Sequence, residues 1–315
     1  MARRTIRMLA TALIGLVLFA GGCTTPSSPP TVATSSPASP SVTASATTAP
    51  DFTQPEAGLE IIRKLIDAAG NSRTIMVQVS RTEATVTVVV GAEAQAWGYR
   101  DGAIKQVATD IQYVDQAIFD INDFNLSDVG ALFRTASSVS GSDAQQSLQV
   151  VDYSGGDVLM TVSTNPESRP VFFRSDGTLV STLDFHTKSG IEEGLTDAIG
   201  QKQQVFRVGV DSALGAYIDY VGMNNTTLRR LRPAKFPAST SGRSNAPDRP
   251  EFHASVVSAD RIWQVLEGLR QEGTFTSETV WSVAVEDREG TGTPKMYFTV
   301  GGTSFTTTLD GEKVG

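Results

Sequence analysis

The residues best suited to catalysis are His186 and His253, the only histidines among 315 residues. His186 follows Asp184-Phe185, and His253 precedes Ser255 by two positions. A histidine with a carboxylate and a serine is the arrangement of a hydrolase, but no Gly-x-Ser-x-Gly turn accompanies it. Two histidines on the surface or at strand edges are the simpler interpretation. We therefore expect no enzyme, no catalytic residue and no cofactor.

An oxygen-rich stretch, residues 119–128, raises the question of a calcium loop. Such a loop needs a ligand at its fifth position and a glycine at its sixth. Counting from Asp120, those positions hold Phe124 and Asn125, so we expect no metal here. The alternation of Phe119 and Ile121 instead predicts a half-buried strand that leads to a helix N-cap.

A dense basic run, residues 228–235, contains Arg229, Arg230 and Arg232. These arginines are candidate contacts for an anionic partner such as a phospholipid or a wall polymer. The alternative is a solvated strand edge that charge and proline protect from pairing.

The aromatic residues Trp97 and Tyr99 flank Gly98 just before a turn. Aromatic side chains on the open face of an antiparallel sheet are typical binding anchors. Trp97 and Tyr99 are therefore further candidate binding residues.

The N-terminal stretch predicts export and a lipid anchor. Three arginines precede an apolar run at 8–19, and Ala20-Gly21-Gly22 leads to Cys23, the only cysteine. A charged start, a short apolar run and a small-residue exit are typical of a secretory signal. The quartet ending at Cys23 resembles a bacterial lipobox, although Ala20 stands where leucine is usual. That resemblance implies a diacylated, palmitate-bearing Cys23 at the mature N-terminus. We expect a signal peptide at 1–22 and anchoring to the outer face of the cytoplasmic membrane.

Composition separates a tether from a folded part. Residues 24–50 are Thr, Ser, Pro and Ala apart from two valines, which predicts a disordered segment, and we place the lipidated tether at 23–54. It resembles the tethers of actinobacterial lipoproteins. The full chain carries a net charge of −8, and without residues 1–22 the charge is −11. So acidic a chain is not expected to bind nucleic acid.

Periodicity predicts four helices, each followed by strands. We expect the helices at 55–70, 126–139, 191–199 and 259–269, the second capped by Ser127. The expected strands lie at 75–79, 85–90, 94–107, 148–153, 157–163, 171–185, 205–210, 216–222, 227–236, 279–286, 295–300 and 303–314. The runs at 94–107, 171–185 and 303–314 each turn at an Asp-Gly pair, and 238–250 is expected to be a polar loop.

The elements repeat. Residues 65–70 match 195–200 at four of six positions, and Asp176-Gly177 with Val180 matches Asp310-Gly311 with Val314. Equal order and spacing indicate an internal duplication. We predict an α+β fold of two halves, 55–188 and 189–315, each of two α-β-β-β units with helices on one face of an antiparallel sheet.

A helix, three antiparallel strands and a closing Asp-Gly turn followed by valine resemble PepSY-type domains over residues 56–315. The same layout occurs in tandem modules like β-lactamase-inhibitor protein. The third unit departs from the pattern, having Leu231-Arg232-Pro233 at its turn. The resemblance implies a secreted or membrane-attached module that binds without catalysis.

The expected function is therefore a non-catalytic binding module of the cell envelope. Its partners are the bilayer, through acylated Cys23, and an envelope protein, peptide or wall component. The alternative is a carrier of a lipid or another apolar ligand, which a large apolar cavity would favour.

Overall fold

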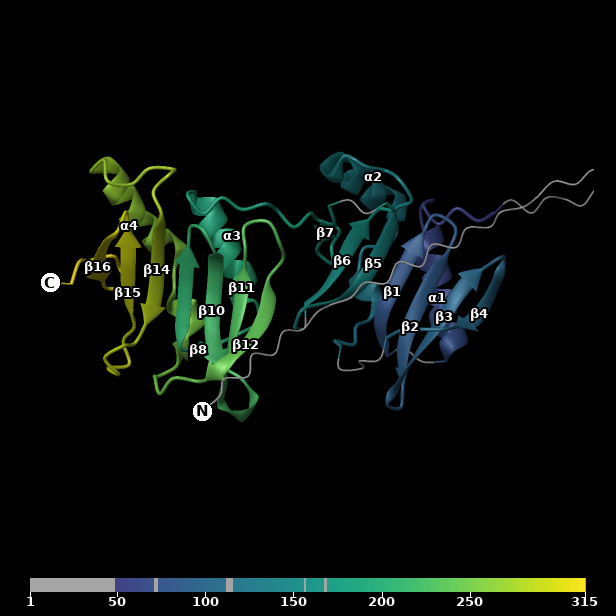
Figure 1. Cartoon of the computed structure of the whole chain (residues 1–315), viewed down its shortest axis with the longest axis horizontal. Coiled ribbons are helices and arrows are strands. Elements are labelled where there is room, and N and C mark those ends of the chain that lie inside the picture. Colours follow the sequence, from purple (N-terminus) through teal and green to yellow (C-terminus); the bar gives the residue numbers. More distant parts are fainter. Residues whose placement is uncertain (1–48, 71–72, 112–115, 156, 167–168, 315) are drawn as a thin grey trace, which may run out of the picture. The chain divides into compact units, whose positions relative to one another are not determined.

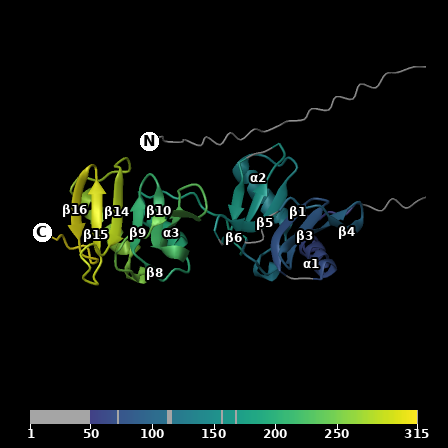
Figure 2. The same cartoon turned by 60° about the horizontal axis from the view of Figure 1, so that its bottom comes forward.

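The computed structural model describes residues 49–314 apart from 71–72, 112–115, 156 and 167–168. The elements can be followed by their labels in Figures 1 and 2. The α-helices are α1 (Ala57–Ala69), α2 (Val129–Ser140), α3 (Lys188–Ile199) and α4 (Ala259–Gln271). The first seven strands are β1 (Thr74–Ser80), β2 (Ala84–Val90), β3 (Glu93–Arg100), β4 (Ala103–Val107), β5 (Ser147–Tyr153), β6 (Asp157–Ser163) and β7 (Val171–Phe173).

The remaining strands follow α3. They are β8 (Gln204–Val205), β9 (Arg207–Asp211), β10 (Gly215–Val221), β11 (Thr226–Arg232), β12 (Ser239–Asn245), β13 (Phe252–His253), β14 (Trp281–Glu286), β15 (Lys295–Val300) and β16 (Thr303–Thr307). Short 3₁₀ helices occupy Ile121–Asp123, Met223–Asn225 and Ala254–Val256.

Two antiparallel seven-stranded sheets share one topology. The first has the order β4-β3-β2-β1-β5-β6-β7, and the second has β12-β11-β10-β9-β14-β15-β16. In each sheet the first strands of the two units, β1 with β5 and β9 with β14, pair at the centre. The α+β class and the duplication into two similar halves are thereby confirmed.

Each sheet packs its helices against one face. Residues Leu59, Ile62 and Leu65 of α1 share a core with Val129 of α2 and with the alternate apolar residues of the first sheet. A second, separate core contains Ile191 of α3, Ile262 of α4 and the apolar residues of the second sheet. The face opposite the helices is called the open face below. The expected division at 188/189 lies at the first turn of α3, but Leu183 and Phe185 before it already belong to the second core, and the first core ends at Phe173.

The Asp-Gly turns near the ends of the two halves, Asp176-Gly177 and Asp310-Gly311, have matching hydrogen bonds. The N–H of Arg174 donates to Thr178 O at 2.8 Å, and the N–H of Thr308 donates to Glu312 O at 2.9 Å. Both glycines have positive φ, 88° at Gly177 and 92° at Gly311. These values suit glycine because it lacks a Cβ.

The expected polar loop at 238–250 is wrong in its first part, because Ser239–Asn245 forms β12 and pairs with β11. The strand expected at 227–236 ends at Arg232. Serine, threonine and glycine are weak strand signals, and pairing with a neighbour overrides them here. The strand β11 is consequently internal and is not the exposed edge that the alternative interpretation assumed.

Three smaller expectations are also corrected. The stretch expected as a strand at 119–121 has one bridge, between Phe119 and Thr74, and then a 3₁₀ turn in which Asp120 caps Asn122. The strand expected over 171–185 covers only 171–173, followed by a bridge at Leu179. Helix α2 is capped by Asp128, whose side chain accepts from the N–H of Ala131 at 2.7 Å.

Candidate functional site

The arginines of the basic run point to opposite faces of the second sheet. Successive side chains of a strand alternate between faces. Arg230 pairs with Ile218 and Arg232 with Ala216, both buried core residues, so these two arginines lie on the helix side. Arg229 pairs with Asp219 and lies on the open face. The run therefore forms no single cationic patch.

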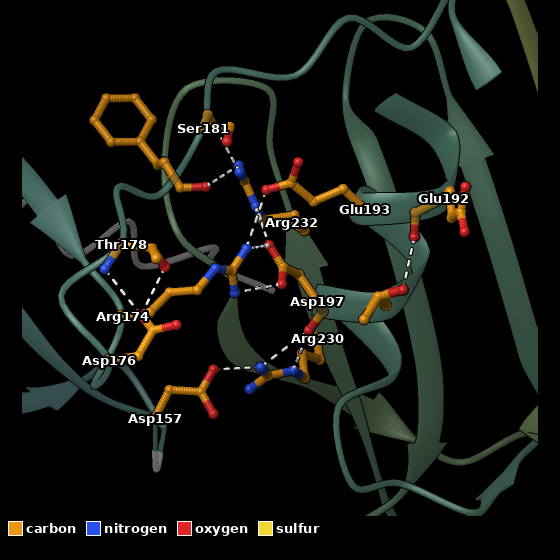
Figure 3. A network of polar contacts seen from close by, with 12 residues as sticks. Asp157, Arg174, Asp176, Thr178, Ser181, Glu192, Glu193, Asp197, Arg230 and Arg232 are labelled. Atoms are coloured by element: carbon orange, nitrogen blue, oxygen red, sulfur yellow. Dashed lines mark hydrogen bonds and ion pairs between the residues drawn. The ribbon is translucent and has the colours of Figure 1, made fainter. Parts of the chain in front are cut away.

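Arg232 is the buried centre of a polar network (Figure 3). Its side chain is fully buried, and Nε donates to Asp197 Oδ2 at 2.8 Å. The remaining N–H groups donate to the carbonyls of Ser181 and Phe236, each at 2.6 Å, and to that of Pro233. A guanidinium held in this way is not available to a ligand.

The same network joins residues of the two sheets. Arg174, which follows β7, donates to Asp197 Oδ1 at 2.8 Å and forms an ion pair with Glu193 at 3.1 Å. Arg230 donates to the Asp197 carbonyl and pairs with Asp157 of β6. Burial raises the pKa of Asp197, but hydrogen bonds from Arg174 and Arg232 outweigh it and hold that pKa below its usual value. Three arginines face three carboxylates, so the network is neutral and structural.

The open face of the second sheet carries a row of charges in register across its strands. The row consists of Arg229, Asp219, Arg207, Glu286 and Lys295. Asp219 is paired with Arg229 at 2.6 Å and with Arg207 at 3.6 Å. Glu286 is fully buried and is paired with Arg207 at 2.7 Å, with Arg288 at 3.3 Å and with Arg249. The carboxylates therefore order the arginines around them.

The neighbouring row on this face places two tyrosines either side of two small residues. Tyr217, Gly209, Ala284 and Tyr297 follow one another across β10, β9, β14 and β15. The Tyr217 ring covers Gly209 so closely that a Cβ there would lie 2.3 Å from ring atom Cζ. Burial raises the pKa of Tyr217, so its hydroxyl stays protonated.

Each tyrosine is stacked with an arginine. The guanidinium of Arg229 lies 4.0 Å from the Tyr217 ring centroid, and that of Arg288 lies 3.7 Å from the Tyr297 centroid. We call the set Tyr217, Gly209, Ala284, Tyr297, Arg229 and Arg288 the tyrosine trough. Four members of the set, Tyr217, Ala284, Tyr297 and Arg288, line a hollow of ≈ 330 Å³, whose lining also includes Ser282, Thr299, Ser304 and Thr306.

The open face of the first sheet lacks this pattern. Its central row reads Gly98, Thr85, Gln78, Gln149 and Thr161, which are all uncharged. Arg100, at the end of β3, donates to Thr85 Oγ1 at 2.8 Å. The charged row and the tyrosine trough thus belong to the second half.

Trp97 and Tyr99 lie on the helix side of the first sheet. Trp97 pairs with the buried Val86, and both aromatic side chains pack against the first core. Tyr99 makes an edge contact with Phe52 at 5.4 Å between ring centroids. Neither residue is therefore an anchor on the open face.

The histidines make separate local contacts. His186 forms a hydrogen bond through Nε2 to Thr279 O at 3.0 Å and lies 3.3 Å from Asp184. His253 Nδ1 lies 2.6 Å from Ser255 Oγ and caps a 3₁₀ turn. Across the residues that the structure describes, no group of three or more His, Cys, Asp and Glu side chains could hold a metal ion.

A second hollow, of ≈ 1050 Å³, lies beside α2 and the ends of β1 and β5. Its lining is mostly polar, including Gln78, Ser80, Arg134, Gln146 and Ser147. This lining does not provide the apolar surface that a lipid carrier needs.

The lipidation site Cys23, the signal peptide and most of the tether lie outside the described residues. Among the helices of the described part, none is long and apolar enough to cross a membrane.

Comparison with known proteins identifies no family. No family model matches the chain, and no curated protein matches it. Among solved structures, the H. pylori beta clamp in complex with 5-chloroisatin aligns with 78% of this chain and 62% of that chain at 9% identity. The alignment thus spans less than two thirds of the clamp, and its TM-score of 0.13 is too low to carry an argument.

Proposed function

We propose that the protein is a non-catalytic binding module of the cell envelope, anchored through acylated Cys23 to the outer face of the cytoplasmic membrane. The anchor rests on the sequence around Cys23 and on the Ser/Thr/Pro-rich tether that follows it. The PepSY-like order of elements belongs to the same proposal. The binding surface is the open face of the second sheet.

The observation that carries the proposal is the tyrosine trough. Tyrosine and arginine are enriched among the residues that dominate binding energy at interfaces. Here ion pairs and ring stacking fix both arginines before a partner arrives. Groups that are already ordered lose less conformational entropy on binding. A partner of this face therefore meets a surface that needs little rearrangement.

The experiment is crosslinking in the native envelope. A photoreactive amino acid replaces Thr299, an exposed residue of the trough lining, and in a matched strain it replaces Glu272, the exposed C-cap of α4. We expect a discrete adduct from position 299 and none from position 272. Equal patterns from the two positions would contradict the proposed surface.

The anchor is tested in the same strains with an alkyne analogue of palmitate. The wild-type protein should carry the label and remain with the membranes. The Cys23→Ala variant should lose both properties. A labelled or membrane-bound Cys23→Ala protein would contradict the lipid anchor.

A further inference from the structure

We propose that the tyrosine trough binds an extended, acidic peptide segment of a partner protein. This inference rests on the proposed function and adds the chemical class of the partner. The charges of the open face, its dimensions and its hydroxyl groups support it.

The charge of this face is opposite to that of the chain. Arg207, Arg229, Arg249 and Arg288 surround the carboxylates of Asp219 and Glu286, which leaves the cluster with two positive charges. The whole chain carries −8. The adjoining pair of Lys295 and Glu289, at 2.7 Å, adds no net charge. Asp211, opposite Ser282 on the same face, brings these charges to a net one positive charge. The face is therefore positive where the chain as a whole is negative, which favours an anionic partner.

The unsatisfied charge is accessible at the trough. The side chain of Arg288 is 46% exposed, whereas that of Arg229 is 11% exposed. The bonds from Arg288 to Glu286 are long, 3.3 and 3.5 Å, so its guanidinium can also receive a second carboxylate. Arginine and carboxylate form short bidentate hydrogen bonds, which makes a carboxylate the best-suited ligand for this group.

The dimensions suit an extended chain. The backbones of Tyr217 and Tyr297 are three strand spacings apart, which is about 14 Å at roughly 4.8 Å per strand. An extended peptide rises about 3.3 Å per residue, so about four residues cross the trough. Side chains two positions apart then face the same way. Two acidic residues separated by one position would place both carboxylates toward the arginines, while Ser282 and Thr299 offer hydroxyls to the backbone.

The test uses the intact protein in a neutral detergent and a fluorescent octapeptide of alternating glutamate and threonine. The comparison peptide has glutamine in place of glutamate. Arg288→Gln removes the exposed trough charge, and Arg243→Gln removes an exposed arginine of β12 as the matched control. We expect saturable binding of the acidic peptide, about tenfold weaker for Arg288→Gln and unchanged for Arg243→Gln. Higher ionic strength should weaken the binding.

Several results would overturn the inference. The first is that the glutamine peptide binds as tightly as the glutamate peptide. The second is that Arg288→Gln and Arg243→Gln weaken binding equally. The third is that the protein forms a dimer through this face and then binds no peptide. Binding of phosphatidylglycerol vesicles that depends on Arg288, without binding of the peptide, would assign the face to a lipid surface instead. If position 299 still crosslinks in the envelope while the acidic peptide fails to bind, the proposed function stands and the acidic class of partner falls.

Discussion

Replacing Arg232 with methionine removes a buried cation from the network in Figure 3 and leaves an unbranched side chain in its place. Wild-type Arg232 donates to the Asp197 carboxylate and to the carbonyls of Ser181, Pro233 and Phe236. Asp197 lies in α3, Ser181 lies between β7 and α3, and Pro233 and Phe236 both lie between β11 and β12. The substitution therefore loosens the connection between α3, the end of β11 and the segment that follows β7.

The loss in free energy of unfolding for Arg232→Met depends on which groups the substitution leaves unpaired. Breaking a buried ion pair from one side costs about 3–5 kcal/mol. Asp197 keeps its bond to Arg174, so we expect the lower end of that range, about 3 kcal/mol. With a urea dependence of about 2 kcal/mol per molar, the unfolding midpoint of the second half should fall by about 1.5 M.

The assay is urea unfolding followed by tryptophan fluorescence. The chain has three tryptophans, and Trp97→Phe leaves Trp263 and Trp281, both of which belong to the second core or pack against it. Arg243→Met, on the exposed surface of β12, is the control. A midpoint for Arg232→Met within roughly 0.3 M of its parent would refute the reasoning, because it would mean that these acceptors lose little free energy when Arg232 no longer donates to them.

The acid side of the stability profile should depend on Asp197. Because its pKa is lowered, the Asp197 carboxylate stabilises the folded state above the usual carboxyl range, about pH 4, and this stabilisation is lost as the pH falls through the lower folded pKa. Urea midpoints measured against pH should therefore fall less steeply in acid for Asp197→Asn than for wild type. Gly311→Ala should cost about 1–2 kcal/mol in the same assay because φ is 92°, and Gly177→Ala, at φ 88°, should cost a similar amount in its own half. Unequal costs would contradict the equivalence of the two turns. Glu286→Gln leaves three arginines around a neutral amide, so the second half should lose about 3–5 kcal/mol while the acidic octapeptide binds more tightly; binding that does not tighten would contradict electrostatic attraction at this face.

Local patterns predicted most of the scaffold. The strands at 157–163 and 295–300 have the expected bounds, and the Asp101-Gly102 hairpin forms as its residues require, with positive φ at both positions. These elements were predictable because alternation and turn chemistry act over a few neighbouring residues. The strand β12 was not, because its conformation comes from hydrogen bonding to β11, which no local pattern encodes.

The candidate site was harder to predict. Once 226–232 is taken as a strand, alternation alone places Arg229 on one face of the sheet and Arg230 and Arg232 on the other. This part of the site can therefore be predicted from the sequence. The carboxylates that order this face, Asp219 and Glu286, are 67 residues apart in the chain. They meet in one row only because β10, β9 and β14 pair in a particular register. Register depends on the whole sheet, so local reasoning did not find these residues.

The duplicated halves differ outside their two apolar cores. Asp67 and Asp197 occupy matching positions in the repeat 65–70 and 195–200, yet Asp67 is exposed while Asp197 binds Arg174 and Arg232. Most helix-facing strand residues are apolar in both halves because each sheet has its own core to fill, with Arg230 and Arg232 as exceptions. Open-face positions carry no such requirement, so one sheet presents threonine and glutamine and the other arginine, carboxylate and tyrosine. Both kinds of open face are compatible with the same scaffold, so the scaffold alone does not account for the charged row, and the proposed binding role is confined to the second sheet for this reason.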